Sequence, residues 1–219
     1  MNSPVTGARV LVLLAHPDLQ ASRVHRQLRQ ALQQLPQDAP GMPRIELRDL
    51  YALYPDFDLD PAAEQAALAD ADLIVWQHPI HWYSMPALMK LWLDRVLSAG
   101  WAYGHGSRAL AGKDLWLVAS TGGHAEAYQP EGYNQHPFST FLAAYEQTAR
   151  LCGLRFLPPL LLHGAHALSP TELAGHAERY VARLQSYPAW PELAALPGCT
   201  PCEVPDGDRR PLQSVQAPT

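Results

Sequence analysis

Three residues between positions 16 and 23 carry groups that can bind an anion. His16 follows the apolar run 9–15, and Ser22 opens a run with helical spacing of its apolar residues, 22–35. The start of a helix exposes free backbone N–H groups and a partial positive charge, which attract phosphate. Ser22 adds a hydroxyl, while His16 and Arg23 add charge-assisted donors. The segment has neither a P-loop nor a GxGxxG pattern, and a helix cap alone is the competing interpretation of Ser22.

A second candidate segment, residues 78–86, contains two adjacent aromatic residues. Trp82 and Tyr83 lie between Pro79 and Pro86, after a second apolar run. Aromatic faces stack on planar rings, and backbone N–H groups between the prolines can bond to a polar ring edge. The segment therefore fits one wall of a site for a planar ligand. A hydrophobic cluster under the loop, or a contact between subunits, is the alternative interpretation.

A third candidate segment, Ser120–Gly123, ends in two glycines. Glycine has no Cβ, so the backbone can approach a ligand closely there. Thr121 supplies a hydroxyl, and Tyr128 can cover a bound ring. Taken alone, the segment is equally a glycine-rich turn. Together the three segments provide a phosphate-binding end, an aromatic wall and a glycine-lined rim, which fit a flavin mononucleotide.

These segments need a scaffold, and the rest of the chain supplies alternating strands and helices. Apolar runs rich in β-formers predict strands at 9–15, 44–50, 72–78, 114–120 and 155–162, the last at an edge or a bulge because it contains Pro158 and Pro159. Apolar stripes and caps predict helices at 22–35, 61–69, 86–99 and 137–152, and another after Ser169. We therefore expect a doubly wound α/β fold, with a five-stranded parallel sheet of order 2-1-3-4-5 and helices on both faces. All three segments then lie at the carboxyl ends of strands, where such folds bind ligands.

The prolines divide the chain near its carboxyl end. Seven of the 21 prolines fall between residues 188 and 219, and proline prevents a continuing helix or a central strand. We therefore expect a flavin-binding domain at residues 1–186 and a tail at 187–219 that is dispensable and contributes no core element. Cys199 and Cys202 form a CxxC pair in this tail. Without a second pair or a strand–helix context, we interpret it as a coincidence rather than a redox or zinc site.

The composition excludes several classes of protein. The 219 residues are 47% hydrophobic and 17% charged, and the formal net charge is −5 without basic runs. Nucleic-acid binding usually needs a clustered basic face. The apolar runs are shorter than the ~20 residues of a membrane span, and no signal peptide is visible. Three cysteines do not make a disulfide framework, and we expect a cytoplasmic protein.

The segment 78–97, HPIHWYSMPALMKLWLDRVL, resembles the quinone reductase family of flavodoxin-like flavoproteins. Its proline, aromatic pair, Pro-Ala step and Lys-x-Trp-x-Asp-Arg-Val run follow the order of that family's signature. Supporting matches are LLAHPDLQASR (13–23), DLYALYPDFD (49–58), GWAYG (100–104), STGG (120–123) and LCGLRFLPPLLLHGAH (151–166). Within the family the resemblance is closest to the ancillary proteins of glutathione-regulated potassium efflux systems.

The resemblance implies a homodimer that binds one flavin per subunit at the interface. FMN is favoured over FAD because no second nucleotide-binding motif is visible, and no metal is implied. The residues that the resemblance places at the flavin phosphate are His16, Ser22, Arg23 and Val24. The residues that it places along the ring are Pro79, Ile80, His81, Trp82, Tyr83, Ser120, Thr121, Gly122, Gly123 and Tyr128.

The resemblance also implies an activity, NAD(P)H:quinone oxidoreduction, in which hydride passes from NAD(P)H to the flavin and then to a quinone. The protein then positions the reactants and balances charge. The implied catalytic groups are the backbone amides of Gly122 and Gly123 and the side chain of Tyr128, with His124 and His136 as further candidate proton donors. A potassium/proton antiporter is the implied partner, which would hold the protein at the cytoplasmic side of the inner membrane.

Two alternatives stay open. A flavin-binding regulatory subunit of a potassium efflux transporter would need no turnover. A zinc-dependent deacetylase would use the segment Ala15-His16-Pro17-Asp18, but Leu19 stands where that class has its second acid. Its third ligand would have to come from His163 or His166.

Overall fold

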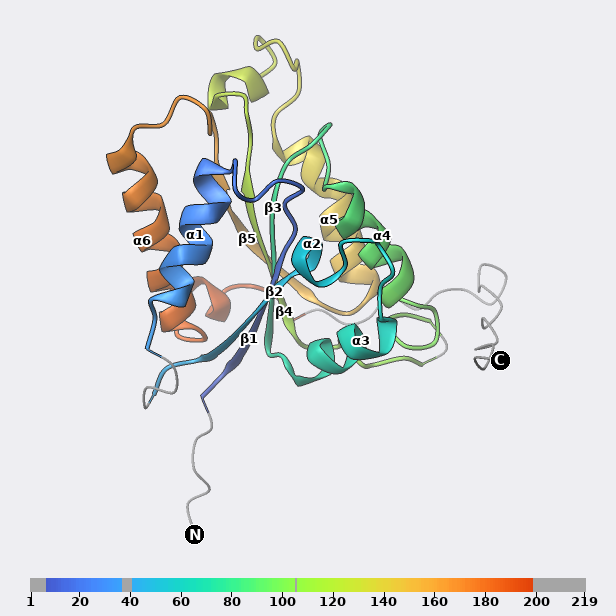
Figure 1. Ribbon diagram of the computed structural model, residues 1–219. Helices are drawn as coiled ribbons and strands as arrows, with labels where there is room; N and C mark the ends of the chain where they lie inside the picture. The colour runs from blue at the N-terminus through green and yellow to red at the C-terminus, as the bar shows by residue number, and fades with distance from the viewer. Residues whose placement is uncertain (1–6, 37–40, 105, 199–219) are drawn as a thin grey trace.

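A computed structural model of the chain describes residues 7–36, 41–104 and 106–198 (Figure 1). Within them, strands and helices alternate along the chain as the sequence predicts. Cys199 and Cys202, on which the interpretation of the CxxC pair depends, lie outside the described residues. No helix of the described ranges is both long and apolar enough to cross a membrane.

The centre of the fold is a five-stranded sheet in which all neighbouring strands are parallel. Its order is β2-β1-β3-β4-β5, which confirms the predicted doubly wound arrangement. The strands are β1 (Arg9–Leu14), β2 (Arg44–Asp49), β3 (Leu73–Pro79), β4 (Asp114–Ser120) and β5 (Arg155–Leu162). Every residue of β3 and β4 is buried, as expected of central strands that are covered on both faces.

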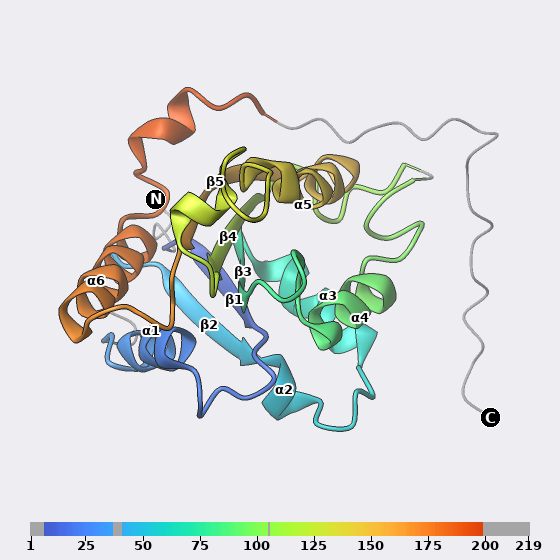
Figure 2. The ribbon, with the colours of Figure 1, turned by 90° about the horizontal axis from the view of Figure 1, so that it is seen from above.

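Helices cover both faces of the sheet (Figures 1 and 2). One face carries α1 (Arg23–Gln33) and α6 (Pro170–Ser186), and the other carries α3 (Pro61–Asp70), α4 (Ala87–Val96) and α5 (Ser139–Leu151). Each layer has its own buried cluster. Leu28 and Tyr180 belong to the cluster under α1 and α6, while Trp92 and Tyr145 belong to the cluster on the opposite face.

Polar side chains fix where several helices begin. Ser22 caps α1, and Ser169 forms a capping box at the start of α6, each by accepting a hydrogen bond from an amide of the first turn. Asp49 caps a short helix, α2 (Leu50–Leu53), in the same way. The strand predicted over 44–50 therefore ends one residue earlier, because Asp49 starts a helix at that point.

The two prolines of β5 lie where a strand tolerates them. Neither Pro158 nor Pro159 can donate a hydrogen bond to a neighbouring strand. β5 is an edge strand, and its register against β4 shifts between Trp116 and Val118. This confirms the prediction, made from the two prolines, that the strand lies at an edge or a bulge.

A buried carboxylate joins the helices of one layer to the sheet. Glu64 of α3 is fully buried and accepts hydrogen bonds from Arg48 Nε (3.0 Å), Tyr54 Oη (2.6 Å) and Trp92 Nε1 (2.9 Å). These three donors offset the cost of burying the charge. The network fixes α4, and with it the loop that enters α4 from β3.

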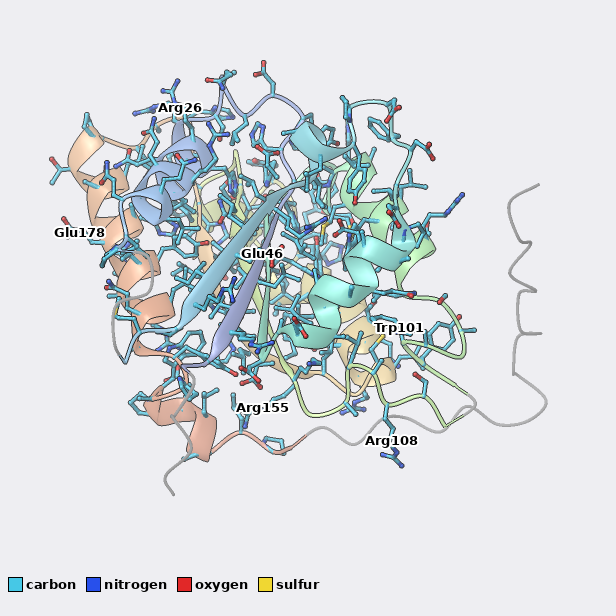
Figure 3. The ribbon with its side chains drawn as sticks, turned by 60° about the horizontal axis from the view of Figure 1, so that its bottom comes forward. Arg26, Glu46, Trp101, Arg108, Arg155 and Glu178 are labelled. Carbon is cyan, nitrogen blue, oxygen red and sulfur yellow. The ribbon has the colours of Figure 1, made fainter. Side chains whose placement is uncertain are left out.

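The expectation that residues from 187 onward contribute nothing to the core is wrong for Tyr187 and Trp190. Both are buried in the cluster under α6, and a short helix, η2 (Pro191–Ala194), follows them. Tyr187 Oη donates to the buried Asp114 (2.9 Å), which also forms an ion pair with Arg155 at the amino-terminal end of the sheet (Figure 3). Proline ends the helix here, but it does not prevent the next aromatic residues from packing. The domain boundary at 186 itself stays a prediction.

Trp190→Ala should lower the free energy of unfolding by about 3–5 kcal/mol, the usual cost of emptying a buried tryptophan site. The ring packs edge-on against Trp116, and its Nε1 donates to Arg183 O (2.7 Å). Urea unfolding followed by circular dichroism measures the change. Glu131→Ala is the control, because that side chain is exposed and surface replacements usually stay within about 0.5 kcal/mol. Equal stability of the two variants would show that the fold does not depend on this segment.

Candidate functional site

Three loops meet at the carboxyl ends of the central strands, at the top of the view in Figure 1. They follow β1, β3 and β4, which are neighbours in the sheet. Backbone hydrogen bonds continue the pairing past the strand ends, from Ala15 N to Gln77 O (2.9 Å) and from Ile80 N to Ser120 O (2.7 Å). The structure thus brings together the three segments that the sequence singles out.

The start of α1 is arranged to receive an anion. Ser22 is buried, and its Oγ accepts the amide hydrogen of His25 (3.0 Å). Within the described part of the chain, the amides of Arg23 and Val24 have no hydrogen-bond acceptor. They are free donors at the positive end of the helix dipole. His16 lies beside this turn, with its ring centroid 5.6 Å from that of His25.

The guanidinium of Arg23 points elsewhere. Its two terminal nitrogens donate to the carbonyl oxygens of His166 (2.9 Å) and Leu168 (2.6 Å), in the loop between β5 and α6. The side chain therefore holds α1 to that loop, and the side chain of Val24 is buried. A role of Arg23 and Val24 at a phosphate stays a prediction. Their backbone amides, rather than their side chains, could fill that role.

The loop after β3 presents its aromatic pair in a strained turn. His81 and Ser84 exchange two backbone hydrogen bonds (2.9 and 3.0 Å), and between them Trp82 and Tyr83 have φ values of 49° and 64°. Positive φ at both central residues is typical of a type I′ turn, which favours Asn and Gly because other residues are strained there. Trp82 is 93% exposed, while Tyr83 stacks on Phe141. An exposed aromatic ring in a costly conformation is typical of a binding surface.

The glycine-rich loop after β4 has no side chains at Gly122 and Gly123, and the second glycine has close neighbours. A Cβ at Gly123 would lie 2.5 Å from Tyr133 Oη and 3.4 Å from the Cβ of Ala127. Thr121 Oγ1 closes the loop by donating to Gly123 O (2.7 Å), and Gly122 is exposed. This bare stretch of backbone can therefore come close to the polar edge of a planar ring.

A tyrosine and a histidine meet at the rim of this loop. Tyr128 ends the short helix η1 (Ala125–Tyr128), and its ring centroid lies 5.3 Å from that of His163, which follows β5. His163 Nδ1 lies 2.9 Å from Thr121 Oγ1. Burial raises the pKa of the Tyr128 hydroxyl and lowers the pKa of His163. Sequence reasoning missed His163 as a neighbour of Tyr128, because only the pairing of β4 with β5 brings the two together.

Sequence reasoning also missed His25, which lies beneath the site. It is buried, and its Nε2 lies 2.9 Å from Ser120 Oγ. Burial, followed by the nearby His16, His78, His176 and His81, holds the pKa of His25 well below its usual range. Burial and His81 lower the pKa of His16 in the same way. These rings are therefore neutral near pH 7, and an approaching anion would raise their pKa values.

The zinc alternative finds no ligand set in the described part of the chain. Within it, no three His, Cys, Asp or Glu side chains converge on a point that could hold a metal ion. His16 Nδ1 accepts the amide hydrogen of Asp18 (3.1 Å), and the carboxylate of Asp18 accepts that of Ala21 (3.1 Å). Both side chains thus serve the turn that leads into α1.

Known proteins place this architecture in a family. A family model described as a flavodoxin-like fold matches residues 8–185. The chain belongs to the flavodoxin-like fold family. It is 43% identical over 185 residues to the glutathione-regulated potassium-efflux system ancillary protein KefF of Salmonella typhi, a match that covers 84% of this chain and 98% of that protein.

Two solved structures resemble the chain. The general stress protein 14 of Treponema denticola, in complex with FMN, has a TM-score of 0.74 at 37% identity over 80% of this chain and 97% of its own. An NADPH-quinone reductase from P. pentosaceus has a TM-score of 0.69 at 27% identity over 81% and 98% of the two chains. Together with KefF, they confirm the resemblance that the segment 78–97 carries.

Trp82→Asn should raise the free energy of unfolding by up to about 1 kcal/mol, because asparagine tolerates positive φ better than tryptophan. Little packing is lost within the chain, since the ring is exposed. The midpoint of urea unfolding, followed by fluorescence at a protein concentration low enough to keep the chain monomeric, measures the effect. Tyr133→Asn replaces another exposed ring where φ is not positive and should bring no gain. A less stable Trp82→Asn protein would contradict the strained turn.

The buried histidines predict that acid destabilises the fold. Burial lowers the pKa values of His78 and His176 to about 4, so the unfolded chain takes up protons first as the pH falls. The contribution of these two neutral rings to the free energy of unfolding is therefore complete above pH 6.5. It is lost as the pH falls toward 4, by up to about 1.4 kcal/mol per pH unit for each proton. Urea unfolding between pH 7 and 4.5 measures this slope. His176→Gln should remove about one proton from this slope. Gln129→Ala, at an exposed residue that does not titrate, should leave the slope unchanged.

Proposed function

We propose that the protein is a flavin-dependent NAD(P)H:quinone oxidoreductase that holds FMN and acts as a homodimer. The observation that carries the proposal is the meeting of free helix amides, a bare glycine loop and an exposed aromatic turn at one edge of the sheet. These features match the phosphate, the polar ring edge and the ring face of FMN. The FMN held by the Treponema protein and the name of the P. pentosaceus reductase support the proposal.

The residues present fit this cofactor. Ser22 Oγ, with the amides of Arg23 and Val24, would bind the phosphate, and His16 would add its Nε2–H, since its Nδ1 accepts from the amide of Asp18. The remaining contacts would come from Pro79, Ile80, His81, Trp82, Tyr83, Ser120, Thr121, Gly122, Gly123 and Tyr128. A Cβ at position 123 would lie 2.5 Å from Tyr133 Oη, so a side chain there would displace that exposed ring from the rim of the site. A bound flavin would supply the redox chemistry, accepting hydride from NAD(P)H and passing it to a quinone.

The chain's own groups would position the reactants and balance charge. The amides of Gly122 and Gly123 would stabilise negative charge at the polar ring edge. Burial keeps Tyr128 protonated and His163 neutral at pH 7. With the hydroxyl of Thr121 between them, they form a set of groups that can hold or pass a proton. His124 and His136 stay candidates for the same task.

The homodimer is proposed from the exposed rings at the rim. Trp82 and Tyr133 are 93% and 76% exposed, and large exposed aromatic side chains mark sites of association. A second copy of the chain would cover them and enclose the ring end of the site. Gel filtration with light scattering tests this, since a monomer at micromolar concentration would contradict it.

A second candidate function is a flavin-binding regulatory subunit that docks on a potassium/proton antiporter at the cytoplasmic side of the membrane. The similarity to KefF, an ancillary protein of a glutathione-regulated potassium-efflux system, favours this role. The same bound flavin would serve both roles, so the two are compatible. Turnover with NAD(P)H and quinone distinguishes them.

The test begins with the visible spectrum of the purified protein. Flavin bands, and release of FMN on denaturation, are expected, followed by quinone-dependent oxidation of NAD(P)H. A colourless protein that takes up neither FMN nor FAD would refute both functions. Bound FMN without quinone-dependent turnover would leave only the regulatory role.

Ser22→Ala should weaken FMN binding by about ten- to a hundredfold, because it removes a donor to a charged phosphate worth about 1.5–3 kcal/mol. Fluorescence titration of the apoprotein with FMN measures the affinity. Ser169→Ala is the matched control, since it removes the N-cap of α6 and should change stability alone. If both variants bind FMN as tightly as the native chain, Ser22 is only a helix cap.

A further inference from the structure

A layer of buried polar side chains lies between the sheet and the helices α1 and α6, directly beneath the candidate site. It contains His25, Gln77, Ser120 and His176, each at most 4% exposed. Burying polar groups costs free energy unless they are hydrogen-bonded, and the surrounding cluster is otherwise apolar. The proposed function explains Ser120 through its place at the ring, but it leaves His25 without a role.

His25 contacts both ends of the site. Its backbone amide donates to Oγ of Ser22, the N-cap of α1 (3.0 Å). Its ring Nε2 lies 2.9 Å from Oγ of Ser120, the last residue of β4 before the glycine loop. One residue thus connects the turn that would bind the phosphate with the strand end that would carry the ring.

Ser120 extends this connection to the third loop. Its carbonyl oxygen accepts the amide hydrogen of Ile80 (2.7 Å), at the start of the loop that presents Trp82 and Tyr83. Its side chain contacts His25, and its backbone leads into Thr121 and the glycines. The bond between His25 and Ser120 is therefore a side-chain hydrogen bond that links the first loop with the other two.

The ring of His25 is suited to this task because it is rigid and uncharged. Burial disfavours protonation of the ring, and the nearby imidazoles of His16, His78, His176 and His81 add to this effect. A neutral imidazole that is hydrogen-bonded to the hydroxyl of Ser120 fixes the distance between α1 and the end of β4. An apolar side chain could not form this bond, and burial would oppose a charged one.

We infer that His25 is a positioning residue, which sets the distance between the phosphate end and the ring end of the site through its hydrogen bond to Ser120. The inference rests on the proposed binding of FMN. Its consequence is that the ring of His25 acts on FMN affinity without touching the ligand. It also predicts that the effects of replacing His25 and Ser120 on FMN affinity are not additive.

The test is FMN binding to the apoprotein, measured by fluorescence titration for a set of variants. His25→Leu and Ser120→Ala should each weaken binding by about three- to tenfold, the range for one neutral hydrogen bond. The double variant should bind no more weakly than either single variant. His25→Gln should restore most of the affinity, because its amide can reach the place of Nε2. His176→Leu, an equally buried histidine without a bond to Ser22 or Ser120, should bind as the native chain does.

Three results would overturn the inference. The first is native affinity in His25→Leu, provided that its circular dichroism and unfolding are those of a folded protein. The second is full additivity of the His25 and Ser120 effects. The third is failure of His25→Gln to bind better than His25→Leu. A native chain that binds no flavin at all overturns the proposed function as well, so the two failures are distinct.

Discussion

The parallel pairing of β1, β3 and β4 determines the rest of the molecule. These strands are buried on both faces, so their backbone groups must pair with each other, and this fixes the register of Leu14 with Gln77 and of Pro79 with Ser120. Side chains alternate along each strand. Gln77 and Ser120 therefore face α6 and α1, where they meet Tyr180 and His25, while His78 faces α5 and stacks on Tyr145. A slip of one residue would exchange the two sets and separate the loops of the site.

The two ends of the sheet differ in how well their buried polar groups are paired. At the amino-terminal end, Asp114 is held by both Arg155 and Tyr187. At the carboxyl-terminal end, one ring or amide nitrogen of each of His25, Gln77, His78 and His176 has no partner among the described residues. The strained turn at Trp82 lies at this same end. Local conflicts of this kind collect at functional sites, because a sequence chosen for stability alone would remove them.

The fold and the three loops were predictable from the sequence because both rest on local patterns. Apolar runs and helix caps report burial and helix starts within a few residues, and a doubly wound sheet then dictates which loops share an edge. What the sequence did not reveal depends on contacts between distant segments. The guanidinium of Arg23 turns to carbonyls beyond β5, His163 reaches Tyr128 through strand pairing, and Trp190 packs on Trp116 although prolines flank it. The start of α2 at Leu50 was missed for a local reason, since one aspartate cap outweighed the alternating pattern of β2.

The site is closed at one end and open at the other, and this asymmetry follows from the fold. The phosphate end is built on α1, whose packing against α6 buries Ser22 and His25. The ring end is built on loops that extend beyond the sheet (Figure 1), and the rings of Trp82 and Tyr133 remain exposed. Affinity for a nucleotide would thus come mainly from the rigid, buried end, whereas the choice of what approaches the ring would lie with the exposed end. Replacing the exposed rings would then change what approaches this end without disturbing the buried contacts around Ser22 and His25.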